Sequence, residues 1–212
     1  MSDTFSYKFR YRGKLSDPKK IYDFMAEAED VCQSNNWEYR IWDEDWRQPS
    51  SLSLTTVNQT MHFDGHAPLK GISFSVGESE NIWLTFMPDG MLQSLMSLAD
   101  PMFLGNDAEF PWQRTKTGYD PPETIIPMYK FLHYVADKYC SVFEVAEEAE
   151  YWEHKDDARF TEWLNAVKKN RWIMQQELAA LEEDKSLTKE ESKEKFYAIL
   201  RKYGRRDGKI IE

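Results

Sequence analysis

The chain has 212 residues, of which 41% are hydrophobic and 30% charged, a composition typical of a globular protein with a core of ordinary size. Its 27 basic and 37 acidic side chains give a formal charge of −10, which argues against nucleic acid and anionic membranes as general partners. No apolar run is long enough for a signal peptide or a membrane span, and two isolated cysteines indicate reduced thiols. We therefore expect a cytoplasmic protein.

The N-terminal part is expected to form a strand, a helix and a second strand. Residues 5–11 alternate between aromatic and polar side chains, the pattern of a half-buried strand. Asp17 and Pro18 suit the start of a helix, and apolar residues then recur at helical spacing over residues 21–32. A second alternating strand follows at residues 37–41.

A clear hairpin lies between two ambiguous segments. Residues 48–69 are rich in Ser, Thr, Asn and Gly, and we interpret them as a long loop with one or two irregular strands. Residues 72–76 and 82–86 alternate as two strands joined by a turn. The run 91–98 fits a strand and a short helix equally well, and both interpretations stay open.

The next stretch joins an unusual strand, a helix and an acidic aromatic run. The strand, residues 112–117, is polar on both faces. The helix is expected over residues 124–139, because Pro127 is tolerated only near a helix start. A short strand at residues 142–145 then leads into the acidic aromatic run of residues 147–154.

The C-terminal part is predicted to be a helical hairpin appended to the main domain. Apolar residues keep helical spacing on a charged background after residue 156, and Thr188 and Glu191 form a capping box for the last helix. The predicted division is an α+β domain at residues 1–156, the hairpin at 157–204 and a flexible tail at 205–212.

The two strand–helix–strand segments with a hairpin between them predict an α+β fold related to split β-α-β plans. We expect a mostly antiparallel sheet with both helices on one face, and the C-terminal helical hairpin added to it. The apolar faces of these strands and helices all have to pack at this one sheet. We therefore expect five residues to share one core: Phe9, Phe24, Phe74, Leu84 and Leu132.

A resemblance supports this fold. Five short motifs carry it: Lys116-Thr117, Lys138-Tyr139, Glu144-Val145, Tyr151-Trp152-Glu153 and Asp156. With them, residues 70–156 resemble an uncharacterised bacterial α+β family with a Lys-Thr strand end, a helix and an acidic Tyr-Trp-Glu motif. Residues 147–150 depart from that family's Asp-Glu-Gly-Gly pattern, which puts in doubt any role that needs glycine there. The resemblance implies a fold and no activity.

The polar strand has two interpretations. It is either an edge strand protected by charge or a strand that lines a polar site. In the second case the strand–helix–strand connection brings both strand ends to the same side of the sheet, where ligands often bind. Lys116 would then meet Glu148 or Glu150 between aromatic walls. The candidate ligand-binding residues are Lys116, Thr117, Glu148, Glu150, Tyr151 and Trp152.

No catalytic or metal-binding signature is recognisable in the sequence. The acidic run with His154 lacks the spacing of a metal loop, and His62 and His66 share one loop without helical placement or Cys partners. Nucleophile elbows, phosphate-binding glycine loops and dinucleotide fingerprints are also missing. We expect no metal and no cofactor.

Three functions are compatible with these observations. The leading hypothesis is a non-enzymatic domain that binds another protein, in a regulatory or immunity-like role. The alternative is an enzyme or small-ligand module that uses a corner of Lys116, Glu148 and Tyr151. Nucleic-acid binding ranks third, because the net charge opposes it. Its candidate basic aromatic sheet face consists of Lys8, Arg10, Arg12, Arg40 and Trp42. The sequence leaves the oligomeric state open.

Overall fold

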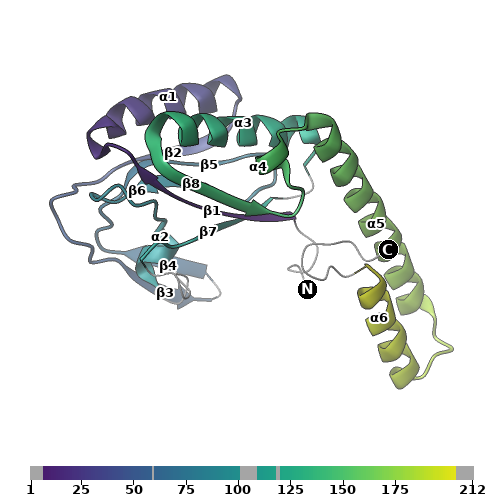
Figure 1. Cartoon of the computed structure of the whole chain (residues 1–212). Coiled ribbons are helices and arrows are strands. Elements are labelled where there is room, and N and C mark those ends of the chain that lie inside the picture. Colours follow the sequence, from purple (N-terminus) through teal and green to yellow (C-terminus); the bar gives the residue numbers. More distant parts are fainter. Residues whose placement is uncertain (1–6, 59, 101–108, 118–119, 204–212) are drawn as a thin grey trace. The chain divides into compact units, whose positions relative to one another are not determined.

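The computed structural model describes residues 7–58, 60–100, 109–117 and 120–203 and confirms the α+β class (Figure 1). The chain divides into two compact units: a larger unit of residues 8–146, and a smaller unit made mainly of residues 147–203. The predicted domain boundary after Asp156 concerns independent folding and stays a prediction.

The strands form three small antiparallel sheets, with the orders β7-β1-β8, β2-β5-β6 and β3-β4. Their bounds are β1 (Tyr7–Leu15), β2 (Glu38–Asp43), β3 (Ser53–Val57), β4 (Thr60–Asp64), β5 (Lys70–Ser75), β6 (Ile82–Phe86), β7 (Gln113–Thr117) and β8 (Cys140–Glu147). The sequence predicted one sheet, whereas the structure has two separate three-stranded sheets. Residues 90–92 connect these two sheets by backbone hydrogen bonds and β-bridges. There the Leu15 N–H donates to Gly90 O at 2.9 Å, the Leu92 N–H donates to Gly13 O at 3.0 Å, and Leu92 bridges to Phe86.

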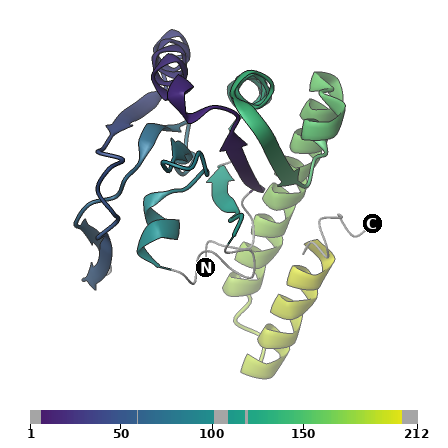
Figure 2. The same cartoon turned by 60° about the vertical axis from the view of Figure 1, so that its left-hand side comes forward.

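Two helices cover one face of these strands. The larger unit contains η1 (Pro18–Lys20), α1 (Ile21–Ser34), α2 (Leu95–Ala99) and α3 (Pro122–Tyr139). Figure 2 shows α1 and α3 side by side above the strands, as predicted. All five residues predicted for the core are at most 2% exposed. They include Phe24, whose ring packs edge-on against Phe86 and Tyr139 at 5.5 and 5.4 Å.

The start of α3 differs from the prediction. The helix begins at Pro122 rather than near Thr124, so Pro127 lies inside it. Pro121 and Pro122 explain the early start, because the fixed φ of proline suits the first helical positions, where no N–H partner is needed. Pro127 itself cannot donate to the carbonyl one turn earlier.

The ambiguous segments acquire defined structure. Residues 48–69 contain the antiparallel hairpin of β3 and β4, in which Thr55 faces His62. The run 91–98 combines both interpretations, because Leu92 forms a β-bridge and α2 begins directly after Ser94. The Ser94 side chain caps this helix by accepting from the Ser97 N–H.

The smaller unit is helical, and the predicted C-terminal helical pair is confirmed. It contains α4 (Tyr151–His154), α5 (Asp157–Glu183) and α6 (Lys189–Tyr203). Thr188 and Glu191 form the predicted capping box at the start of α6, through hydrogen bonds of 2.9 and 3.3 Å. Five side chains of this unit that are buried are Tyr151, Phe160, Leu164, Val167 and Met174. Among the described helices, none is long and apolar enough to cross a membrane.

Candidate functional site

The outer surface of β1 and β7 is strongly basic. On β1, Phe9, Tyr11 and Leu15 point inward and are buried, and Phe9 packs against Tyr129 of α3 at 5.6 Å. Strand alternation therefore turns the intervening residues away from α1 and α3. Six cations lie on this outer side, which we call the cationic face: Lys8, Arg10, Arg12, Lys14, Arg114 and Lys116. Four of them are exposed, whereas Arg12 and Lys116 are partly buried.

Aromatic rings hold the two arginines of the cationic face in place. The guanidinium carbons of Arg10 and Arg12 lie 4.6 and 4.3 Å from the Trp112 ring centroid, and Arg12 also lies 4.8 Å from Phe110. Glu144 of β8 accepts a hydrogen bond from Arg12 at 2.8 Å. Such cation–π and charge-assisted contacts restrict the arginine rotamers. The cationic face is therefore partly ordered before any ligand binds.

The inner side of β7 explains why this strand is polar on both faces. Gln113, Thr115 and Thr117 point inward and are buried. Thr115 Oγ1 donates to Asn81 O at 3.3 Å, so polar inward residues are used to join β7 to the segment before β6. Because β7 lies at the edge of the order β7-β1-β8, the structure has the geometry of the edge-strand interpretation.

Tyr11 completes this polar layer. Its hydroxyl accepts a hydrogen bond from the Trp83 N–H at 2.6 Å. Complete burial raises the pKa of Tyr11 well above its usual value of 10, so the phenol stays protonated at neutral pH. The hydroxyl therefore joins β1 to β6 as a neutral hydrogen-bonding group.

Lys116 and Thr117, the first candidate ligand residues, are engaged within the larger unit. The Lys116 N–H donates to Glu80 Oε2 at 3.0 Å, and the Glu80 N–H donates to Lys116 O at 2.8 Å. Lys116 Nζ lies 3.7 Å from Glu80 Oε1, a half-exposed ion pair of small energetic value. Thr117 is buried on the inner side. Glu80 was not among the predicted partners of Lys116, because only the folded turn brings residues 80 and 116 together.

The acidic residues of positions 147–150, which include the candidates Glu148 and Glu150, lie in the smaller unit and shape the turn before α4. Glu147 accepts a hydrogen bond from the Trp152 N–H at 3.0 Å and another from the Ala149 N–H. Glu150 adopts a left-handed conformation with φ of 55°, and its carboxylate accepts a hydrogen bond from Arg159. These contacts fix the turn in the way that an N-terminal capping segment does.

Tyr151, the aromatic candidate, is a core residue of the smaller unit. It is 2% exposed, its ring packs on Phe160 at 5.1 Å, and its hydroxyl donates to Asp157 Oδ1 at 2.7 Å. Burial raises the pKa of Tyr151 above the usual range. Glu148 and Trp152 beside it are partly buried. Because Lys116 and Thr117 belong to the other unit, the predicted recess that would join both groups stays a prediction.

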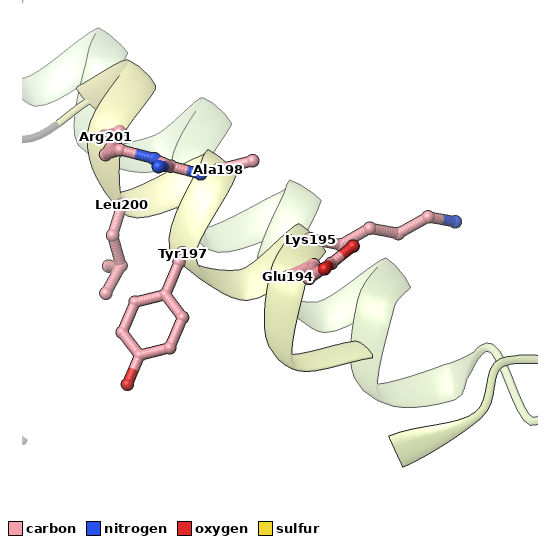
Figure 3. A pocket seen from close by; sticks show the side chains of 6 residues that line it. All are labelled: Glu194, Lys195, Tyr197, Ala198, Leu200 and Arg201. Atoms are coloured by element: carbon pink, nitrogen blue, oxygen red, sulfur yellow. The ribbon is translucent and has the colours of Figure 1, made fainter. Parts of the chain in front are cut away.

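A surface depression lies on α6. Its lining residues are Glu194, Lys195, Tyr197, Ala198, Leu200 and Arg201, and Figure 3 shows Tyr197 and Leu200 projecting on the same side of the helix. Tyr197 is 50% exposed. Since a single helix supplies every lining residue, the depression is an open surface rather than an enclosed ligand site.

His66 has structural partners, and both cysteines are free thiols. His66 Nε2 lies 3.0 Å from Asp45 O, and its Nδ1 lies 3.6 Å from Glu44. Burial raises the pKa of Cys32 and of Cys140 to about 12, so both thiols are protonated at neutral pH. Within the described part of the chain, no three His, Cys, Asp or Glu side chains form a group that could hold a metal ion.

The basic aromatic face was predicted in part. Lys8, Arg10 and Arg12 share the cationic face, whereas Arg40 stacks on Trp42 at 3.9 Å in the sheet of β2. Trp42 is 6% exposed and donates to Ser73 Oγ at 3.0 Å, which makes it structural. Lys14, Arg114 and Trp112 were not among the residues predicted for this face. The available signal was the alternation of cations along residues 8–14, which continues past the predicted end of the strand.

No protein-family model matches the chain, and no curated protein or solved structure matches it either. The resemblance of residues 70–156 to an uncharacterised bacterial family therefore remains an expectation.

Proposed function

We propose that this protein is a non-enzymatic binding module that captures an acidic segment of another protein through the cationic face. The observation that supports this is the concentration of six cations on the outer side of β1 and β7, in a chain whose formal charge is −10. Among the outward residues of these strands and β8, Glu144 is the acidic one, and it pairs with Arg12. The surplus of positive charge favours an anionic ligand.

The chemistry of the cationic face favours carboxylates over nucleic acid. Arg10 and Arg12 already stack on the ring of Trp112, whereas single-stranded nucleic acids bind through aromatic faces on which bases can stack. The acidic remainder of the chain also repels an extended phosphate backbone. A guanidinium group, in contrast, matches a carboxylate with two parallel hydrogen bonds. Within the chain, Arg12 already binds a carboxylate, since Glu144 Oε2 lies 2.8 Å from its Nε and 2.7 Å from its Nη2.

The proposed setting is the bacterial cytoplasm, with a regulatory or immunity-like role. The resemblance of residues 70–156 supports the bacterial origin. Two free cysteines, Cys32 and Cys140, support a reducing compartment. Partner capture through charge suits such a role, because electrostatic complementarity accelerates association and selects the partner.

The test is binding of a labelled poly-glutamate peptide to the full-length protein, measured by fluorescence anisotropy. The double variant Arg10→Glu/Arg114→Glu reverses two exposed charges of the cationic face. We expect it to weaken binding by at least about tenfold, which corresponds to about 1.4 kcal/mol. The control, Lys19→Glu/Lys20→Glu, makes the same change in net charge at exposed positions of η1 and should leave the affinity within about twofold.

A second variant separates geometry from charge. Trp112→Leu keeps the net charge but removes the ring that orders Arg10 and Arg12, so it should weaken peptide binding while retaining the far-ultraviolet circular dichroism of the parent. Equal losses in the cationic-face variant and its control would contradict a defined site. Tighter binding of single-stranded oligo-dT than of poly-glutamate would contradict an acidic protein partner.

A further inference from the structure

The hairpin of β3 and β4 is an incomplete sheet. Within the described residues it contains only these two strands, paired antiparallel from Ser53 opposite Asp64 to Val57 opposite Thr60 (Figure 1). Of its described strand residues, all except Leu54 and Phe63 are exposed. Isolated two-stranded hairpins are at best marginally stable in water, and three or more strands with an apolar face are normally needed. The hairpin therefore gains stability from an added strand.

The free edge of β3 lacks the devices that normally prevent strand addition. Exposed edges are usually protected by lysine, proline, inward charges or bulges. The sequence of β3, Ser-Leu-Thr-Thr-Val, contains no charge and no proline, although 30% of the chain is charged. Three of its five residues are β-branched and favour extended structure. The neighbouring β4 instead carries His62 and Asp64.

We infer that β3 is the dimerisation edge of this protein and that β3 of a second copy of the chain adds to it antiparallel. With the two-fold axis at Thr55, the two Thr55 residues face each other and Leu54 lies opposite Thr56 of the second copy. Thr–Thr cross-strand pairs are favourable, and a neutral strand meets itself without like-charge repulsion. The closed two-fold symmetry is the commonest in soluble oligomers.

A second copy of the chain paired at β3 also extends the apolar face of the hairpin. Leu54, Thr56, Met61 and Phe63 share one face, since Leu54 pairs with Phe63 and Thr56 with Met61. Met61 is 53% exposed. An antiparallel pair with its axis perpendicular to the sheet keeps each face on its own side, so the apolar faces of both copies become continuous in the order β4-β3-β3-β4. Self-pairing at β4 would instead place two His62 imidazoles opposite each other.

The first test is cysteine cross-linking of the full-length protein. Thr55→Cys lies on the proposed axis, where directly opposite Cβ atoms are about 4.5–5.5 Å apart, so mild oxidation or a short bismaleimide should give a covalent dimer. Thr60→Cys is the matched control on β4. The β4 strands of the two copies lie about 14 Å apart across three strand spacings, which separates the two Cys residues by at least that distance. The unsubstituted protein gives the background of Cys32 and Cys140. Cross-linking of Thr60→Cys as efficient as that of Thr55→Cys overturns the assignment.

The second test is the oligomeric state by sedimentation at several protein concentrations. The parent should be a dimer at high concentration, and Thr55→Lys should raise the dimer dissociation constant at least about tenfold by placing two ammonium groups opposite each other. Thr60→Lys should leave the dissociation constant unchanged. Circular dichroism checks that both variants are folded. A parent protein that stays monomeric at every concentration refutes the inference and leaves the proposed binding through the cationic face intact.

Discussion

At the scale of single residues, Glu27 is the clearest link between the two helices of the larger unit. Its carboxylate in α1 accepts hydrogen bonds of 2.7 and 2.8 Å from Lys138 Nζ in α3, and another from the Tyr134 hydroxyl. The hydrogen bonds from Lys138 and Tyr134 lower the pKa of Glu27 from its usual 4.5 to about 2. The side chains are exposed, so solvent screens part of this interaction.

This pKa predicts how the contribution of Glu27 depends on pH. A carboxyl group whose pKa is lower in the folded state stabilises the fold above its unfolded pKa of 4.5, and the stabilisation is lost as the pH falls toward about 2. Glu27→Gln should therefore lower the urea midpoint at pH 7. The difference from the parent should shrink as the pH falls below about 4.5, as measured by circular dichroism in urea titrations.

A double-mutant cycle assigns this effect to the contact. In a Lys138→Met background the loss caused by Glu27→Gln should be smaller at pH 7, because the main hydrogen-bond donor is absent. A loss that stays constant from pH 7 down to pH 3, or one that is the same in both backgrounds, would show that the link to α3 does not stabilise the fold.

At the scale of secondary-structure elements, periodicity determined what could be predicted. The alternation in β1 and the helical spacing in α5 extend over enough residues to identify type and buried face. The hairpin of β3 and β4 was read as a loop with irregular strands, since only Leu54 and Phe63 are even partly buried and no alternation develops. The run 91–98 divides at Ser94 into a bridge and a short helix, and each piece is too short for a period.

The candidate site shows the same limit. The polar character of β7 was visible in the sequence, and so were Lys8, Arg10 and Arg12. The reason why β7 is polar could not be seen in the sequence, because Glu80 and Trp112 reach their partners only through tertiary packing. Contacts between residues far apart in sequence leave no periodic signal, so the pairing of Lys116 with Glu80 could not be predicted from the sequence.

Helices α3 and α6 differ in how many side chains they bury, which predicts a difference in the hydrogen exchange of their amides. In α6, all of which the structure describes, no side chain is buried, and Glu177 of α5 joins it by accepting from Lys202 and Tyr203 at 2.7 Å. In α3 seven side chains are buried. Because few buried contacts mean a low free energy of local opening, amides of α6 should exchange at least about a hundredfold faster than those in the middle of α3. Mass spectrometry of the deuterated full-length protein measures this difference.

Two outcomes of the exchange experiment are informative. Protection of α6 equal to that of α3 would contradict the assignment of α6 as a weakly held element. Protection of α6 that appears only on addition of an acidic peptide would show that ligand binding is coupled to this helix. Tyr197→Ser is the control, since it changes a half-exposed side chain and should leave the exchange rates of α3 unaltered.

At the scale of the whole molecule, the net charge and the local charge of one surface have opposite signs. The value of −10 describes the chain, whereas recognition depends on the local field at a surface. Alternation along β1 collects Lys8, Arg10, Arg12 and Lys14 on one side of a sheet, and β7 adds Arg114. A chain that is acidic on average thus carries a basic surface on β1 and β7.

The division into two units leads to the last prediction, on independent folding. The larger unit buries Phe9, Phe24, Phe74, Leu84 and Leu132 in its own core, whereas Tyr151 packs on Phe160 in the smaller unit. A chain that ends after Asp156 keeps every strand and the helices α1 to α3. We therefore expect it to be soluble, with a single cooperative unfolding transition in urea and the near-ultraviolet circular dichroism of packed aromatic residues.

The truncation also removes the contacts of one buried aromatic residue, and a second substitution can test the effect of that loss. It removes Phe160 and Asp157, the packing and hydrogen-bond partners of Tyr151, and so exposes a side chain that is 2% exposed in the full chain. Adding Tyr151→Ser to the truncated chain should improve its solubility and leave the urea midpoint unchanged, because Tyr151 belongs to the smaller unit. An insoluble product, or a molten globule that binds anilinonaphthalene sulfonate and lacks near-ultraviolet signal with either residue at position 151, would mean that the larger unit needs α5 to complete its core.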